Sequence, residues 1–439
     1  MKKYGLVLGG GGARGSYEIG VWKALREMKI PLCAVVGASV GALNGAIIVQ
    51  DEFEKVEHLW QNITLEHVVK VQRAIENIDE KEMSFKTKFN TIMSALFDGG
   101  LDATPLRKLL KDTIDEEKIR KAPMDFGLIT FSVTDFEPVS IFKKDIPQGK
   151  MVDYLLASAC LPIFKKQQIG NKAFLDGGFY NNIPANMLTK KGIKDLVVVD
   201  IAGPGFVQKV DTKQHNIIYI KSKQSLGGIL EFSPQRAKRN IEMGYKDALK
   251  KFGNLTGVKY YFIPCTDGCK IEYSEWKKIY YTLGMRLDGK ITFDNRIIKE
   301  RIKGALLEYS VGKLTEHNAF LAMVEITSEQ LKINKQQIYT IDELLNEIQK
   351  KYQGIVQEPD FHKKVQEFKE MVFKFKDLSF DKKLEHMITH SKLLMAYNLY
   401  DESTDEALLW FNKFIAVTYP KLAIANAIIS ILQARENLK

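Results

Sequence analysis

Cysteine is scarce in this chain, with four residues among 439. The four are Cys33, Cys160, Cys265 and Cys269, and two of them lie in apolar runs that are expected to be buried. We expect all four to be free thiols in a reducing compartment. Cys265 and Cys269 flank a turn and have no second pair of ligands nearby, so a metal site there is not expected.

Long apolar runs are also lacking. The apolar run after the basic Met1-Lys2-Lys3 extends only from Tyr4 to Leu8 before glycines interrupt it, so no signal peptide is expected. The stretch from Leu422 to Leu432 is too short to span a bilayer and is typical of a packed helix. We therefore expect a cytoplasmic protein that contacts a membrane at most peripherally.

Acidic residues are fewer than basic ones, 54 against 64, which gives a formal net charge of +10. This excess favours an anionic partner, either nucleic acid or an anionic lipid surface, and solubility alone accounts for it equally well. The lysines are spread along the chain and no nucleic-acid-binding motif is present, so we expect no nucleic-acid partner.

One short stretch combines a strand, a turn and a helix around a serine. The apolar run from Leu32 leads to Gly37-Ala38-Ser39-Val40-Gly41, and an apolar helix follows. Glycines on both sides of a serine allow strand and helix to approach closely, which is the nucleophile elbow pattern. Ser39 is therefore a candidate nucleophile.

A second glycine-rich segment, residues 9–15, follows the strand from Tyr4 to Leu8 and precedes a helix. Such a loop presents backbone N–H groups to an anion. The loop formally matches the dinucleotide fingerprint, but Gly37-Ala38-Ser39 stands where the acidic residue of that fingerprint is required. A nucleotide-hydrolase phosphate loop needs Lys and then Ser or Thr after its last glycine, and here Gly15 is followed by Ser16. The remaining anion is the oxyanion of an acyl-transfer intermediate, bound by Gly10, Gly11 and Gly12. Arg14 either assists that oxyanion or only locks the loop by bonding backbone carbonyls.

Strands and helices alternate over the first part of the chain, which favours a single α/β sheet. The almost continuous apolar run from Leu196 to Ile201 is typical of a parallel strand covered on both faces. After about Lys290 the pattern becomes helical. We therefore expect one domain over residues 1–290 and a mainly helical domain of unknown role over residues 291–439.

Two amphipathic regions allow alternative interpretations. Helical patterns within residues 51–102 are a candidate lid or lipid-facing surface, although packing on the core is the commoner arrangement. Phe361, Val365, Phe368, Val372 and Phe375 form a stripe at helical spacing with lysines around it. That stripe is compatible with a helix lying on an anionic membrane, and more typical of a packed helix with a solvated face.

None of the seven histidines lies in a catalytic motif. In the hydrolase order Ser, Asp, His, the best histidine would be His215, but we favour a direct carboxylate base. His386 and His390 have the spacing of metal ligands on a helix, yet Met387 replaces the glutamate of a metalloprotease, so no metal is expected.

Three motif segments follow one another along the chain: Gly10-Gly11-Gly12-Ala13-Arg14-Gly15, Gly37-Ala38-Ser39-Val40-Gly41 and Asp176-Gly177-Gly178. Together they resemble the patatin-like phospholipase family, and residues 157–162 and 181–184 extend the resemblance over about residues 4–202. It implies a three-layer α/β/α fold, Ser39 as nucleophile, Asp176 as base and the first glycine loop as oxyanion hole. Taken alone, Asp176 before Gly177-Gly178 would be a turn residue. The basic Phe164-Lys165-Lys166 departs from the expected pattern.

We therefore expect a serine lipid acyl hydrolase of the phospholipase A or lysophospholipase type. It would act on phospholipid or other acyl lipids, need no cofactor or metal, and contact membranes transiently. The alternative is a non-catalytic lipid-binding or regulatory module on the same scaffold. The sequence gives neither the head group, the acyl position, nor the oligomeric state.

Overall fold

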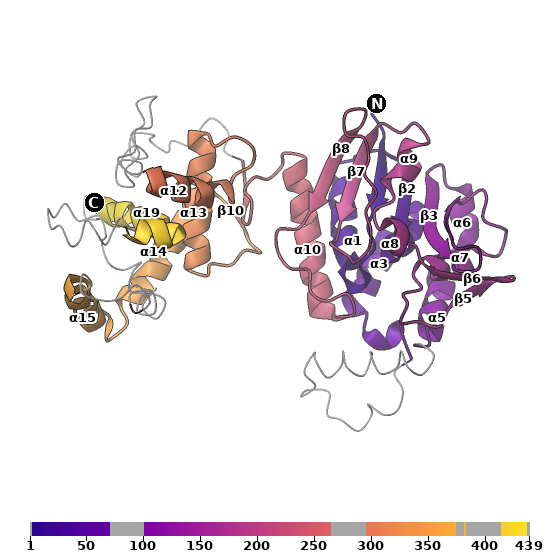
Figure 1. The fold of residues 1–439 in the computed structure, drawn as a ribbon, viewed down its shortest axis with the longest axis horizontal. Coiled ribbons are helices and arrows are strands. Elements are labelled where there is room, and N and C mark those ends of the chain that lie inside the picture. Colours follow the sequence, from indigo (N-terminus) through magenta and orange to yellow (C-terminus); the bar gives the residue numbers. More distant parts are fainter. Residues whose placement is uncertain (1, 71–100, 265–295, 375–381, 383–413, 437–439) are drawn as a thin grey trace, which may run out of the picture. The chain divides into compact units, whose positions relative to one another are not determined.

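The structure is a computed structural model that describes residues 2–70, 101–264, 296–374, 382 and 414–436. The chain divides into two compact units, Met1–Phe252 and Gly253–Lys439. The predicted boundary at residues 290 and 291 falls within residues 265–295, outside the described part, and stays a prediction. Each unit is treated by itself below (Figure 1).

The first unit is organised around one sheet of eight strands. The strand order is β5-β6-β3-β2-β1-β7-β8, and β4 pairs with β3. β1, β2, β7 and β8 run parallel, as does β3 beside β2. The bounds of the strands are β1 Tyr4–Leu8, β2 Leu32–Ala38, β3 Asp125–Ser132, β4 Glu137–Phe142, β5 Gln167–Ile169, β6 Lys172–Asp176, β7 Asp195–Asp200 and β8 Asn216–Lys221.

Helices connect these strands and cover the sheet (Figure 1). They alternate with the strands over much of this unit, as the sequence predicts. The bounds are η1 Gly12–Gly15, α1 Ser16–Glu27, α2 Val40–Gln50, α3 Phe53–Asn62, η2 Leu65–His67, α5 Thr104–Thr113, α6 Glu116–Lys121, α7 Met151–Ser158, α8 Gly178–Asn181, α9 Ala185–Thr189 and α10 Pro234–Lys251.

Side chains of the central strands alternate between two apolar cores. Leu6 and Leu8 of β1 face a large core shared with α1, α2 and α10, whereas Val7 faces a smaller core shared with Leu188 of α9. Successive side chains of a strand point to opposite faces, so a buried parallel strand must be apolar throughout. The predicted three-layer α/β/α fold is confirmed, and among the described residues one outer layer consists of little more than α9 and its flanking loops.

The sheet brings the ends of β2 and β6 together. β2 pairs with β3 as far as Ala38 opposite Ile129, and β6 pairs with the next residues of β3, Asp176 opposite Thr130. β4 occupies the other edge of β3 at these positions, so β6 continues the edge that β2 leaves. Because β6 runs antiparallel, its last residue meets the last residue of β2 end to end. This register places Asp176 beside the turn that carries Ser39.

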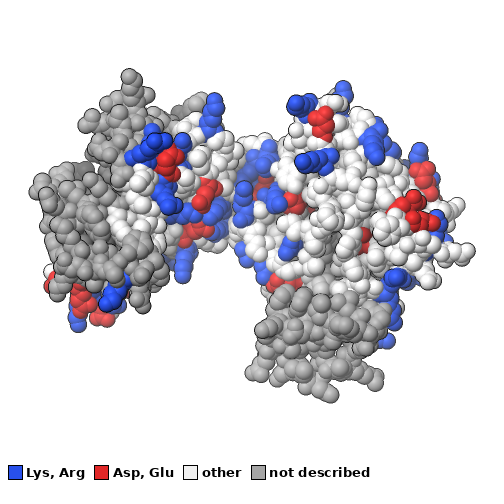
Figure 2. Space-filling model, viewed as in Figure 1, with Lys and Arg blue, Asp and Glu red and all other residues white. Residues whose placement is uncertain are grey.

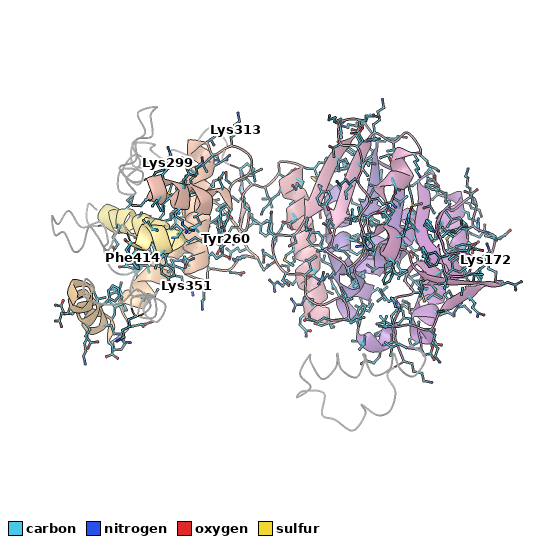
Figure 3. All side chains as sticks on the ribbon, viewed as in Figure 1. Lys172, Tyr260, Lys299, Lys313, Lys351 and Phe414 are labelled. Atoms are coloured by element: carbon cyan, nitrogen blue, oxygen red, sulfur yellow. The ribbon has the colours of Figure 1, made fainter. Side chains whose placement is uncertain are left out.

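The second unit is mainly helical, as predicted for this part of the chain. One difference is a two-residue strand, β10, which pairs with β9 because the chain returns there between α13 and α14. Tyr260, before β9, is fully buried in this unit (Figure 3). In the first unit, Lys172 lies at the outer end of the β5–β6 hairpin. The bounds are β9 Tyr261–Phe262, α12 Arg296–Leu307, α13 Glu316–Gln330, β10 Ile338–Tyr339, α14 Ile341–Val356, α15 Phe361–Lys374 and α19 Pro420–Glu436.

The two amphipathic regions can now be located in part. α3 packs on the core through buried Phe53, Val56 and Trp60, while residues 71–100 of the candidate lid lie outside the described part. On α15, Phe361 and Phe368 are buried in the core of the second unit, which favours the packed-helix interpretation. The described helices include none that is both apolar enough and long enough to cross a bilayer.

Candidate active site

Ser39 occupies a strained turn between β2 and α2. Its φ of 53° and ψ of −129° are rare for a residue with a side chain, and such conformations cost about 1–3 kcal/mol. The Ser39 N–H donates to Oγ of Ser158 at 3.1 Å, and that hydroxyl donates to the carbonyl oxygen of Ile129 at 2.7 Å. Ser158 therefore fastens the turn to β3.

Glycines on both sides make this turn sterically feasible. A Cβ at Gly37 would lie 2.2 Å from the carbonyl carbon of Gly41, and a Cβ at Gly41 would lie 2.5 Å from the carbonyl oxygen of Leu8. Neither distance is compatible with a side chain. The spacing Gly-x-Ser-x-Gly is thus required by close backbone contacts, as the elbow pattern predicts.

Asp176 lies at the end of β6 and is 2% exposed. Its Oδ1 accepts the N–H of Gly178 at 2.7 Å, while its buried Oδ2 has no partner at hydrogen-bond geometry among the described residues. Burial raises the pKa of Asp176 to about 6, and the neighbouring Ser39 side chain and the Gly178 N–H oppose that rise. Catalytic hydrogen bonds are often long before substrate binds. An unpartnered Oδ2 near the Ser39 side chain is therefore compatible with a base that accepts the Ser39 hydroxyl proton.

The first glycine loop lies against this turn, but its N–H groups are not equivalent. The Gly10 N–H donates to the carbonyl oxygen of Asn182 at 3.1 Å, so the Gly10 part of the predicted oxyanion hole is already engaged. The N–H groups of Gly11 and Gly12 have no hydrogen-bond partner within the described residues, and Gly12 has a φ of 57°. The Val40 N–H, at the start of α2, is likewise without an intrahelical partner. Three backbone donors thus remain for an anion.

The Arg14 guanidinium bonds backbone carbonyls. Its Nε donates to the carbonyl oxygen of Gly227 at 2.7 Å, and its Nη1 donates to the carbonyl oxygen of Ala202. These bonds favour the alternative role of Arg14, which is to lock the loop, over the predicted oxyanion role. A guanidinium suits this because its planar fork can bond several carbonyls at once.

His215 and Ser39 lie at opposite ends of the parallel strands, so His215 is too far away to complete a triad. It precedes β8, whereas Ser39 follows β2, and the two strands point in the same direction. A strand of six residues spans about 20 Å. The Nδ1 of His215 is 2.8 Å from the carbonyl oxygen of Asp211. His215 therefore does not lie between Asp176 and Ser39.

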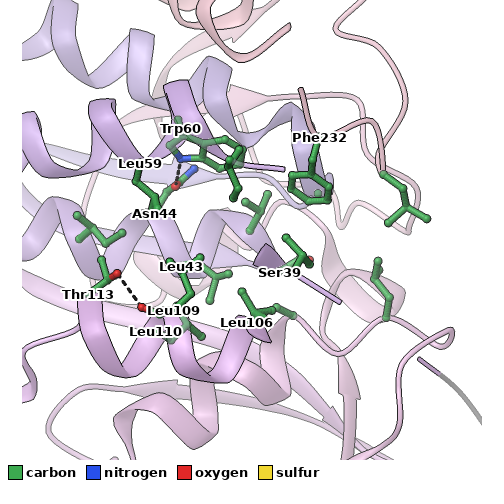
Figure 4. A pocket seen from close by; sticks show the side chains of 18 of the residues that line it. Ser39, Leu43, Asn44, Leu59, Trp60, Leu106, Leu109, Leu110, Thr113 and Phe232 are labelled. Carbon is green, nitrogen blue, oxygen red and sulfur yellow. Dashed lines mark hydrogen bonds between the residues drawn. The ribbon is translucent and has the colours of Figure 1, made fainter. Parts of the chain in front are cut away.

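An apolar pocket, partly open to solvent, begins at Ser39. Figure 4 shows Ser39 at one end and Leu59 and Thr113 toward the other. Its walls come chiefly from α2, α3, α5 and the loop before α10, and they include Val40, Leu43, Ile47, Leu59, Trp60, Ile63, Leu106, Leu109, Leu110, Leu161, Phe164, Leu230 and Phe232. Such a lining binds a hydrocarbon chain through burial rather than hydrogen bonds.

A buried polar network supports one wall of this pocket. The Trp60 indole N–H donates to Oδ1 of Asn44 at 3.0 Å (Figure 4). Nδ2 of Asn44 donates to Oε2 of Glu18 at 2.8 Å. The same amide also donates to the Gly15 carbonyl at 3.0 Å. Burial raises the pKa of Glu18 well above its usual range. This shift favours the neutral acid form of Glu18, and the network joins α1, α2 and α3 beneath the site.

The predicted non-sites can be followed only in part. Cys33 and Cys160 are free thiols, whereas Cys265, Cys269, His386 and His390 lie outside the described residues. Within the described ranges, no three His, Cys, Asp or Glu side chains gather closely enough to hold a metal ion.

Residues 6–189 match the sequence model of the family described as patatin-like phospholipase. This part of the chain is therefore similar to the patatin-like phospholipase family. The neuropathy target esterase sws of Drosophila melanogaster is 27% identical over 206 residues, which are 45% of this chain and 13% of that protein. The lysophospholipase NTE1 of Saccharomyces cerevisiae is 23% identical over 63% of this chain and 16% of its own length. The chain thus spans only a small fraction of the length of the relatives it matches.

Among solved structures, VipD from Legionella pneumophila covers 98% of this chain and 90% of its own, with 14% identity and a TM-score of 0.39.

Two positions within the patatin-like motif segments acquire roles that sequence reasoning did not assign. Ser158 anchors the nucleophile turn, and Asn182 bonds the Gly10 carbonyl through its side chain at 3.1 Å. Both were part of the segments that carry the resemblance, so their positions were marked. Their roles depend on long-range contacts and could not be inferred from spacing.

Proposed function

We propose that the first unit is a serine lipid acyl hydrolase, of the phospholipase A or lysophospholipase type, with Ser39 as nucleophile and Asp176 as base. The observation that carries the proposal is the meeting of three features at one point. A strained serine turn lies beside a buried carboxylate with one open oxygen, at the mouth of an apolar pocket. The esterase and lysophospholipase names of the relatives agree with this chemistry.

The reaction needs only groups of this chain and water. Ser39 Oγ attacks the ester carbonyl carbon as its proton passes to Oδ2 of Asp176, and the N–H groups of Gly11, Gly12 and Val40 bind the oxyanion. The tetrahedral intermediate collapses, the C–O ester bond breaks, and the departing alcohol takes the proton from Asp176. Water then attacks the acyl-Ser39 carbonyl and gives a proton to Asp176. That proton returns to Oγ as the fatty acid leaves.

The raised pKa of Asp176 suits this role. An ordinary aspartate ionises near pH 4 and is a weak base. With a pKa of about 6, the carboxylate is roughly nine-tenths ionised at pH 7 and still accepts a proton more readily than an exposed aspartate. Burial of one side chain therefore replaces the histidine of a triad.

The pocket indicates the substrate class. Its apolar walls extend from Ser39 along α2, α3 and α5, so an acyl chain would lie there with its ester carbonyl beside the nucleophile. Such lipids are held in membranes and micelles, so transient peripheral contact with a membrane is part of the proposal. The cytoplasmic location stays a prediction.

The first test compares Ser39→Ala and Asp176→Asn with wild type on fluorogenic esters and on phospholipid vesicles. We expect Ser39→Ala to lose at least about a thousandfold in hydrolysis. The matched control is Ser140→Ala, at an exposed serine of β4. Full activity in either site variant would refute the dyad.

A fluorophosphonate probe separates the enzyme from the non-catalytic alternative, because only an activated serine reacts with it. We expect one labelled position, Ser39, and no labelling of Ser39→Ala. Retention of lipid by an unlabelled wild-type protein would instead support a binding or regulatory module.

A further inference from the structure

Four large apolar side chains are exposed near Asp176. Two follow Asp176 in the sequence, and two belong to a loop that is joined to those residues by backbone hydrogen bonds. Phe206 is 74% exposed, Val207 55%, Phe179 49% and Tyr180 40%. We call these four residues the apolar rim. Phe179 and Tyr180 belong to α8, which follows Asp176 directly, and Phe206 and Val207 belong to the loop after β7.

Backbone hydrogen bonds hold the two halves of the apolar rim together. The Phe206 N–H donates to the Gly178 carbonyl at 3.2 Å, and the Asn182 N–H donates to the Phe206 carbonyl at 2.6 Å. Asn182 in turn bonds Gly10 of the glycine loop. The exposed side chains are therefore fixed to the same backbone that carries the base and the oxyanion loop.

The surface around the apolar rim suits a hydrocarbon interface. Figure 2 shows few charged side chains on the face that carries α8. Exposed apolar groups gathered at one place on a protein usually mark a binding surface. Phe and Tyr are side chains that insert at the boundary between water and lipid.

Basic side chains stand beside these segments. Lys165 and Lys166 follow the pocket residue Phe164 and are exposed, and exposed Lys209 follows the rim loop. The segment before Lys165 is tied to the base, because the Asp176 N–H donates to the Cys160 carbonyl at 2.8 Å. Lysines at such a boundary attract anionic head groups, each with about 1 kcal/mol near the surface.

We propose that the apolar rim, with Lys165, Lys166 and Lys209, docks the first unit on an anionic phospholipid bilayer so that the Ser39 pocket opens toward it. The proposal rests on the function proposed above, because a lipid hydrolase must draw its substrate from a surface. It explains why the basic Phe164-Lys165-Lys166 stretch stands next to the site. The pocket takes the acyl chain, and the apolar rim takes the surface from which that chain comes.

The test measures vesicle flotation in the Ser39→Ala background, so that hydrolysis does not alter the lipid. The vesicles contain phosphatidylcholine with or without about one-fifth phosphatidylserine. We expect Phe206→Ser/Val207→Ser to reduce the bound fraction at least about fivefold, and Lys165→Glu/Lys166→Glu to remove the preference for phosphatidylserine. The matched control is Phe136→Ser, because Phe136 is 82% exposed and lies on the β3–β4 turn.

A second readout does not depend on bulk binding. Trp introduced by Phe206→Trp should shift its emission to the blue on vesicles and be quenched by brominated phosphatidylcholine, whereas Phe136→Trp should show neither change. Binding unaffected by Phe206→Ser/Val207→Ser, or an equal loss with Phe136→Ser, would overturn the proposal. A rim variant that keeps vesicle binding but changes the sedimentation mass would also overturn it, in favour of a contact between copies.

Failure of this proposal is distinguishable from failure of the proposed function. With active protein, loss of the rim should lower the ratio of vesicle hydrolysis to soluble-ester hydrolysis by about the same factor as binding. An unchanged ratio with Ser39-dependent hydrolysis would refute the docking surface and leave the enzyme standing. Vesicle binding through the apolar rim without Ser39-dependent hydrolysis would do the reverse.

Discussion

Asp176 in the first unit and Glu325 in the second are both carboxylates buried almost completely, at 2% and 0% exposure. Their surroundings differ. Glu325 accepts the N–H groups of Val258, Lys259 and Tyr260, at 2.6, 2.6 and 3.2 Å. Asp176 accepts one backbone N–H through Oδ1 and keeps Oδ2 open.

We interpret this difference as the one between a structural carboxylate and the proposed base. Hydrogen-bond donors around both oxygens stabilise the charged form of a carboxylate and occupy the positions at which it would accept a proton. A buried oxygen left without a donor costs stability, and natural proteins keep such costs mainly where they serve a function. Burial alone would not have distinguished Asp176 from Glu325, whereas the count of donors does.

The largest expected effect comes from removing the open oxygen's charge. Asp176→Asn should lower kcat for a soluble ester by about 10²–10⁴-fold, because a positioned general base contributes that much. Asn can still accept the Gly178 N–H, so the turn should persist. Steady-state kinetics measure the loss; a decrease smaller than about threefold would make Asp176 another structural carboxylate.

The same substitution should stabilise the fold at alkaline pH. The pKa of Asp176 is raised to about 6 in the folded state, so the native protein binds more protons than the unfolded chain between about pH 4 and pH 6. Stability from this group therefore falls as pH rises through that window. At pH 8, Asp176→Asn should gain up to about 3 kcal/mol in the free energy of unfolding, by the linkage of pKa to stability. The gain should vanish near pH 4; urea titrations at both pH values measure it.

Glu325→Ala should have the opposite profile. Three buried N–H groups lose their acceptor, so we expect a loss of about 3 kcal/mol or more in the unfolding of the second unit. Soluble-ester hydrolysis below the transition should stay within about twofold of wild type. Glu347→Ala, on the exposed side of α14, is the matched control. An activity loss in Glu325→Ala similar to that of Asp176→Asn would erase the distinction.

A smaller effect is expected in the pocket. Leu110→Phe should fill space toward the end away from Ser39 (Figure 4). We expect kcat/KM for a sixteen-carbon ester to fall about tenfold relative to a four-carbon ester, since a misfit of one or two methylenes costs about 1–3 kcal/mol. Lys111→Phe, on the exposed face of the same helix, should leave the ratio unchanged. An equal loss for both esters would place the acyl chain elsewhere.

The smallest effect concerns the third buried carboxyl, Glu18. Burial raises its pKa and favours the neutral acid, and Glu18→Gln supplies a neutral group of similar shape. We expect the unfolding free energy to change by less than about 1 kcal/mol, and Glu18→Ala to lose about 2 kcal/mol or more through a cavity. Calorimetry at pH 7 distinguishes them. A large loss in Glu18→Gln would mean that a charged Glu18 supports the network.

The sequence predicted the parts of the site that are local. The turn at Ser39 and the glycine loop are set by residues a few positions apart, so their spacing carried the information. The Gly10 N–H donates to Asn182, 172 residues away, and the Arg14 side chain donates to Gly227, 213 residues away. No local pattern indicates such distant partners. Likewise, the end-to-end meeting of β2 and β6 follows from pairing with β3, which no local pattern records. Asp176 came from family resemblance, and its open oxygen could come only from the structure.

The most direct test of the dyad is the rate of fluorophosphonate labelling at Ser39 as a function of pH. Because labelling requires the base in its charged form, we predict that the rate rises with pH and reaches half of its maximum near pH 6. The Asp176→Asn variant should label at least about a hundredfold more slowly and without this transition. A wild-type rate that is flat between pH 5 and pH 8, or an Asp176→Asn rate equal to that of wild type, would contradict the assignment of Asp176 as the base.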